Sequence, residues 1–132
     1  MKPPRVITED QLDQEFQVRS KLKSGGDYGC MCLVFEGDFV SNDPVALEDN
    51  FFYGLNSDVD GDVGTIVFTG DVTCTGHACI SDRLMCLIVL GDLSAEKLSI
   101  FETEVLVCGN LEVGELNDHD DYLNVLGTSH IL

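Results

Sequence analysis

The feature that most constrains the fold of this chain is an internal repeat. From residue 30 onward, a run of β-forming residues that ends in Gly and a polar residue occurs five times. The runs are Cys32–Asp38, Thr65–Asp71, Cys86–Asp92, Val105–Asn110 and Tyr122–Thr128. Their glycines are spaced 33, 21, 18 and 18 residues apart. Self-similarity at a fixed period of this length is typical of solenoids.

Two further apolar segments follow each turn and give the period a physical meaning. Segments 72–74, 93–95 and 111–113 come first, and segments 78–80 and 98–100 follow. A coil of about 18 residues then has three short strands and three corners, and it must stack on its neighbours to bury its apolar face. We therefore predict an all-β fold, a single-stranded right-handed parallel β-helix of about 18 residues per coil.

The recurrent Gly-Asp or Gly-Asn marks one corner in every coil. We expect Gly to supply a positive φ there and the Asp or Asn side chain to bond nearby backbone. A β-sandwich or jelly roll with hairpins at the glycines is the alternative, and the constant register argues against it. Left-handed hexapeptide solenoids also use 18 residues per coil, but they need a small residue three times per coil. The single glycine per coil favours the right-handed form.

The chain divides near residue 25. Residues 8–23 predict a helix, because Thr8 and Gln11 have the spacing of a capping box and Leu12, Phe16 and Leu22 share one face. We assign residues 1–25 to an N-terminal capping helix segment and residues 26–132 to the β-solenoid. The apolar face of the helix should dock on the strand stack.

Charge distinguishes the two parts of the chain. The chain has 7 basic and 24 acidic residues, and 20 of the acids lie in residues 24–132 against only Arg83 and Lys97. Nucleic-acid binding is disfavoured, because phosphate contacts need Lys and Arg. Such a surface would steer a basic protein toward it. The alternative is that the charge only maintains solubility and discourages edge-to-edge pairing.

Hydropathy and cysteine usage bear on the compartment. The longest aliphatic run, around residues 84–90, is far short of the roughly 20 residues that span a membrane. The first residues lack the apolar core of a signal peptide. Cys32, Cys86 and Cys108 lie in strand-like runs, where a free cysteine behaves as a small buried hydrophobe. We expect a cytoplasmic protein with reduced cysteines and no membrane contact; a secreted disulfide framework is the alternative.

Three clusters have residue types that bind metals without the matching spacing. Segment 58–62 places acids at alternate positions, as a calcium loop does, but lacks the glycine and the final glutamate of that loop. Cys74, His77 and Cys79 do not follow a standard zinc pattern. Segment 117–121 sets a His among acids. No nucleophile motif is present. We expect no metal, no cofactor and no catalytic residue.

The 33-residue gap leaves an irregular loop over residues 41–64 with aromatic and acidic residues. Loops on a regular scaffold are favoured sites of function, and buried aromatics often anchor an interface. Acidic corners of later coils would extend the same surface. The expected partner-binding residues are Phe51, Phe52, Tyr53, Asp58, Asp60, Asp62, Glu102, Glu104, Asp118, Asp120 and Asp121.

The runs Leu87–Ala95 and Val105–Val113 resemble bactofilins and related bacterial polymer-forming cytoskeletal repeat proteins. The resemblance covers about residues 65–131 and consists of one Gly-Asp per coil. It implies a right-handed parallel β-helix that polymerises end to end without nucleotide. Small acidic solenoids of this kind also resemble bacterial immunity proteins that neutralise toxins.

Three classes of function follow. The first, which we favour, is an acidic protein-binding module of the immunity or inhibitor type that captures a basic partner such as a toxin. The second is a self-assembling structural solenoid, a homo-oligomer through its ends. The third is a solenoid enzyme of the acyltransferase or carbonic anhydrase type, which needs histidines between subunits. His77, His119 and His130 fall at different phases of the repeat, so we expect no enzyme.

Overall fold

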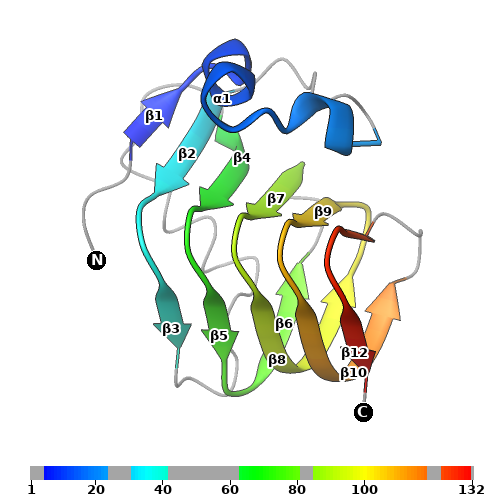
Figure 1. The fold of residues 1–132 in the computed structure, drawn as a ribbon. Coiled ribbons are helices and arrows are strands. Elements are labelled where there is room, and N and C mark those ends of the chain that lie inside the picture. Colours follow the sequence, from blue (N-terminus) through cyan, green and yellow to red (C-terminus); the bar gives the residue numbers. More distant parts are fainter. Residues whose placement is uncertain (1–4, 24–30, 42–62, 81–84, 119–122, 132) are drawn as a thin grey trace.

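The structure is a computed structural model that describes residues 5–23, 31–41, 63–80, 85–118 and 123–131 (Figure 1). Parallel strands stack along one axis, and a helix lies against one side of the stack. The elements in chain order are β1 (Arg5–Ile7), α1 (Glu9–Phe16), the 3-10 helix η1 (Arg19–Lys21), β2 (Met31–Phe35), β3 (Phe39–Ser41), β4 (Val63–Phe68), β5 (Val72–Cys74), β6 (His77–Ile80), β7 (Cys86–Val89), β8 (Leu93–Ile100), β9 (Glu104–Val107), β10 (Leu111–Asp118), β11 (Leu123–Val125) and β12 (Ser129–Ile131).

The strands form two sheets. Sheet A has the order β1-β2-β4-β7-β9-β11, and sheet B has the order β12-β10-β8-β5-β3, with β6 also paired to β8. All pairs are parallel except β1 with β2. Leu93 pairs with Leu111, the residue 18 positions later, and Val105 pairs with Leu123 at the same spacing. The β-solenoid predicted from the repeat is therefore confirmed.

Each strand of sheet A alternates its side chains between two faces. The face that points into the stack carries apolar residues, so the inside of the stack is apolar. Leu33 and Phe35 of β2 point into the stack, where the rings of Phe35 and Phe68 stack with centroids 5.4 Å apart. Sheet B closes the other side of this core with Val72, Leu93 and related residues. The buried inner cluster comprises Leu33, Phe35, Ile66, Phe68, Val72, Cys74, Ala78, Ile80, Leu87, Val89, Leu93, Ala95, Leu98, Ile100, Val105, Val107, Leu111 and Val113.

The other face of sheet A is covered by residues 5–23, which we call the N-terminal segment. Its apolar residues pack on the outward side chains of four strands (Figure 1). Arg5 of β1 forms two ion pairs. A 2.6 Å ion pair to Glu15 connects β1 with α1, and a 2.7 Å ion pair to Glu36, the residue after β2, connects the segment with the stack. The buried outer cluster comprises Ile7, Leu12, Val18, Leu22, Cys32, Val34, Val67, Cys86, Ile88 and Leu106.

The helix is shorter than the sequence predicts. Its start is as expected, because Thr8 and Gln11 form the capping box. The expectation of one helix over 8–23 is wrong: α1 ends at Phe16, and Gln17 turns the chain with a left-handed φ of 54°. The Asp13 carboxylate accepts a 2.9 Å hydrogen bond from the Arg19 backbone N–H and supports this turn. The turn directs Val18, which is buried, onto the sheet.

Two finer expectations about the fold stay predictions. One is the right-handed sense of the coil, and the other is the capping role of the N-terminal segment. In the described structure this segment lies along the side of sheet A, and only β1 pairs with an edge strand. No helix within the described ranges is long and apolar enough to cross a membrane.

Candidate protein-binding surface

One corner of the solenoid carries a continuous ladder of side chain to backbone hydrogen bonds. In each coil the residue after the repeat glycine accepts a bond from the backbone N–H of the equivalent residue in the next coil. The four bonds are Asp71 N–H to Asp38 Oδ1 at 2.8 Å, Asp92 N–H to Asp71 Oδ1 at 2.9 Å, Asn110 N–H to Asp92 Oδ1 at 2.8 Å, and Thr128 N–H to Asn110 Oδ1 at 2.9 Å. The expected bonding of Asp or Asn to backbone is therefore present, but it runs between coils rather than within one.

The repeat glycines serve a purpose different from the expected one. A positive φ occurs only at Gly37, at 93°, among the described glycines. At Gly91 a Cβ would lie 2.6 Å from the carbonyl oxygen of Gly70 and closer still to Oδ1 of Asp71. Gly70, Gly109 and Gly127 have equivalent contacts. The expectation of a positive φ in every coil is wrong, because glycine is needed there for the close approach of the preceding coil.

The ladder borders the outward face of sheet B, where side chains two residues apart share one side. Register aligns Thr73 with Ser94 and Ser94 with Glu112, so polar residues form a row parallel to the ladder. A shallow groove lies between the two rows. Its lining includes Asp71, Asp92 and Asn110 from the ladder and Thr73, Ser94 and Glu112 from the row.

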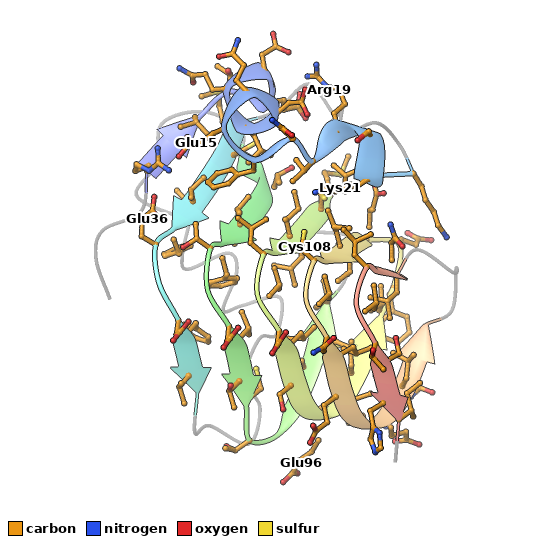
Figure 2. The ribbon with its side chains drawn as sticks, in the orientation of Figure 1. Glu15, Arg19, Lys21, Glu36, Glu96 and Cys108 are labelled. Atoms are coloured by element: carbon orange, nitrogen blue, oxygen red, sulfur yellow. The ribbon has the colours of Figure 1, made fainter. Side chains whose placement is uncertain are left out.

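This face is acidic. Asp38, Asp71 and Asp92 each precede a strand of sheet B, and these strands pair in order, with the general strand spacing of about 4.8 Å. Glu112 is exposed in the adjacent row. Glu96 is exposed within β8, between the residues that pair with β5 and those that pair with β6, and it points away from the stack on the side opposite the helix (Figure 2). None of the residues that line the groove is Lys or Arg. Because neighbouring carboxylates have the same sign, their fields add over the face.

Most of the partner-binding residues expected from the sequence lie outside the described part of the chain. These residues are Phe51, Phe52, Tyr53, Asp58, Asp60, Asp62, Asp120 and Asp121. Asp118 is the last residue of β10, so it ends a strand of the same sheet as the groove. The irregular loop over residues 41–64 and its role therefore stay predictions.

Glu102 and Glu104 were expected at one acidic corner, but the structure separates them. Glu102 is exposed in the bend before β9 and has a left-handed φ of 55°. Glu104 is buried, with 5% of its surface exposed, beneath the N-terminal segment. Its carboxylate accepts a 2.5 Å hydrogen bond from the backbone N–H of Lys23. Glu102 can therefore meet a partner from solvent, whereas the carboxylate of Glu104 bonds within the chain.

Cys74, His77 and Cys79, whose residue types can bind soft metals, do not converge. Cys74 points into the inner core, whereas His77 and Cys79 lie on the other face of β6 from the buried Ala78 and Ile80. The His77 Nε2 atom lies 2.9 Å from the Ser99 hydroxyl. No group of three or more His, Cys, Asp or Glu residues within the described ranges is placed to hold a metal ion. The acids of residues 58–62 lie outside these ranges.

The described cysteines form no disulfide; they are Cys32, Cys74, Cys79, Cys86 and Cys108. Burial raises the pKa of the Cys74 thiol to about 11. Burial also raises the pKa of Cys108, and the positive charge of Lys21 nearby partly opposes that shift (Figure 2). Both thiols therefore stay protonated and weakly nucleophilic at neutral pH.

The acidic face of sheet B was missed as a site from the sequence. The signal was present, because each Gly-Asp begins a strand whose alternate residues must share a face. Counting two and four positions on from Asp92 gives Ser94 and Glu96, and counting two on from Asn110 gives Glu112.

The fold and the acidic face define a β-solenoid with a polar, negatively charged lateral surface. Comparison with protein-family models, with curated proteins and with solved structures finds no match for this chain.

Proposed function

We propose that this chain is an acidic protein-binding module that captures a basic protein, in the manner of an immunity or inhibitor protein. The observation that carries the proposal is the row of ladder carboxylates beside Glu112 on sheet B. A groove lies between them, and its lining contains no Lys or Arg. The net charge of −17 extends the same sign over the chain.

The physical basis is long-range attraction followed by short-range fit. A negative face raises the rate at which a positively charged partner arrives, and the rate falls as salt screens the field. Affinity needs desolvated anchors as well. Phe51, Phe52 and Tyr53 are our candidates for these anchors, and the acids of residues 58–62 would extend the surface.

The test begins with purification of a partner from the native cell by pull-down and mass spectrometry. Association rates are then measured between roughly 0.05 and 0.5 M salt, a range over which the screening length shrinks several-fold. We expect the rate to fall steeply as salt rises. A specific partner whose association rate ignores ionic strength would overturn the proposal.

Charge variants locate the surface. The triple variant Asp71→Asn, Asp92→Asn, Glu112→Gln keeps ladder acceptors, because Asn110 already accepts such a bond. We expect it to slow association about ten-fold or more, within the range by which steering changes rates. The control neutralises Asp10, Glu15 and Glu115, three exposed acids off this face, with the same change in net charge. Equal slowing by both variants would show that net charge acts without a defined site.

The alternative proposal is a self-assembling, bactofilin-like structural solenoid with a right-handed coil. The observation that favours it is the stack itself, in which strand pairing repeats from coil to coil along one axis. Sedimentation of the purified chain separates the two proposals. Filaments favour assembly, and small species favour capture of a partner.

A further inference from the structure

The two ends of the solenoid differ. At the N-terminal end, β1 pairs antiparallel with β2 and occupies the edge of sheet A, with Arg5 opposite Val34. At the C-terminal end, β12 is the last strand of sheet B (Figure 1). Within the described residues, no strand pairs with the far edge of β12. An edge of this kind presents main-chain groups that can pair with another strand.

The edge at β12 has none of the charges that usually protect such a strand. Residues 123–131 contain no Asp, Glu, Lys or Arg, in a chain whose net charge is −17. Leu126 is 46% exposed and Ile131 is 52% exposed in this segment. Proteins commonly guard an edge with Lys or another charged residue. β12 therefore contains no Asp, Glu, Lys or Arg, and it carries the exposed apolar side chain of Ile131.

We propose that this chain forms a twofold dimer in which β12 pairs antiparallel with β12 of a second copy. A twofold axis places identical edges against each other, so each main-chain donor meets an acceptor. With His130 of one subunit opposite His130 of the other, all three residues of each strand pair. Ser129 of one subunit then lies opposite Ile131 of the other.

Charge and geometry both favour a second copy of this chain as the partner, and a total of two copies. Two chains of the same sign repel over most of their surfaces, and an uncharged edge is where they approach with least repulsion. A head-to-tail filament that continues both sheets would need β11 of one copy to pair with β2 of the next, and β12 with β3, but β1 already occupies the edge of β2. A contact between two identical ends closes after two copies. This proposal is independent of the acidic face as a binding site.

Analytical ultracentrifugation of the whole chain over a concentration series tests the proposal. We expect a reversible dimer and no larger species. Raising salt from roughly 0.05 to 0.5 M should tighten the dimer several-fold, because salt screens the repulsion between the subunits. The association with a basic partner should change in the opposite direction, so the two proposals can fail separately. A monomer at all concentrations, or species that keep growing beyond two copies, would overturn the dimer.

A pair of variants identifies the edge. Ile131→Lys places an ammonium group at the apolar end of the core and should abolish the dimer. Val40→Lys is the matched control, since Val40 is an exposed residue of β3, the edge strand at the other end of sheet B. Both variants lower the net negative charge equally, which by itself favours association. Loss of the dimer in both variants, or in neither, would contradict pairing through β12.

Cross-linking tests the register. Residues directly opposite each other in an antiparallel pair have Cα atoms about 4.5–5.5 Å apart, within the range that a disulfide bridges. His130→Cys should therefore give a disulfide-linked dimer under mild oxidation. Glu112→Cys, one strand further in on the same outward row, should not, and the wild-type chain controls for the native cysteines. Cross-linking of both variants to the same extent would reject this register.

Discussion

Oδ1 of Asp71 accepts a 2.9 Å hydrogen bond from the backbone N–H of Asp92, the equivalent residue one coil later. Asp92 repeats the relationship with Asn110 at 2.8 Å. One side chain therefore connects each pair of neighbouring coils at this corner. The same carboxylates face solvent beside the groove, so this row combines a structural bond with the charge of the proposed binding face.

Replacing Asp92 separates these two contributions. Asp92→Ala removes the acceptor for the Asn110 N–H, and we expect the free energy of unfolding to fall by about 1 kcal/mol. Asp92→Asn keeps an Oδ1 acceptor and removes a charge next to the like charge of Asp71, so its stability should stay close to wild type. Urea denaturation measures both variants. An alanine variant as stable as the asparagine variant would show that the bond contributes nothing.

Gly91 tests the close approach of successive coils. In Gly91→Ala the new Cβ meets the carbonyl oxygen of Gly70 and Oδ1 of Asp71, so one coil must shift. Overpacking of this kind lowers the free energy of unfolding by about 1–3 kcal/mol. The change should be smaller in an Asp71→Ala background, where one of the two obstacles is gone. Strict additivity of the two substitutions in urea denaturation would argue against the shared contact.

Leu12 tests how firmly the N-terminal segment holds sheet A. It is buried at 4% exposure in the cluster with Val34, Val67 and Ile88. Leu12→Ala removes that packing and should lower the free energy of unfolding by about 2–4 kcal/mol. Gln14→Ala, an exposed change on the same helix, is the control. An equal, small effect of both variants would mean that the helix contributes little to the fold.

The pKa of Cys74 makes stability depend on alkaline pH. Burial raises the pKa of this thiol from 9.0 to about 11, so the folded chain keeps a proton that the unfolded chain loses. The stabilising effect is complete below about pH 9 and is lost as pH rises toward about 11. Cys74→Ala should flatten this decline in urea midpoints across that window. Burial raises the pKa of Cys108 as well, so part of the decline should remain. Identical pH profiles of variant and wild type would refute the assignment.

The strands and their register were predictable because the signal is local and repeated. The spacing between Gly91 and Gly109 equals the offset between paired residues in β8 and β10. The early end of α1 was not predictable in the same way. Gln17 has no special preference for a left-handed conformation, and the turn there depends on the Asp13 side chain and on the burial of Val18.

The positions of the acidic residues were likewise predictable where the repeat sets them and unpredictable where long-range contacts do. The ladder could be derived from the repeat, since stacking like residues on like residues aligns Asp71 with Asp92. The burial of Glu104 could not be derived, because the Lys23 N–H that meets its carboxylate lies 81 residues away in sequence. A corner acid and an acid beneath the N-terminal segment look alike in a local pattern. Long-range packing decides between them.

Glu104 gives the last prediction. Its buried carboxylate accepts the Lys23 N–H and so fixes the end of the N-terminal segment to β9. Glu104→Ala leaves that donor without its acceptor, and we expect a loss of about 1–3 kcal/mol in the free energy of unfolding. Hydrogen exchange at Lys23 should also become faster. Glu104→Gln keeps an oxygen acceptor and should lose less.

Glu102→Ala is the matched control, since it removes an exposed carboxylate two residues away. We expect it to change stability by no more than about 0.5 kcal/mol. Association with a basic partner should show the opposite preference, because an exposed carboxylate attracts an approaching cation more effectively than a buried one. If Glu104→Gln slows association more than Glu102→Ala does, Glu104 acts on the partner, and its bond to Lys23 is not its main contribution.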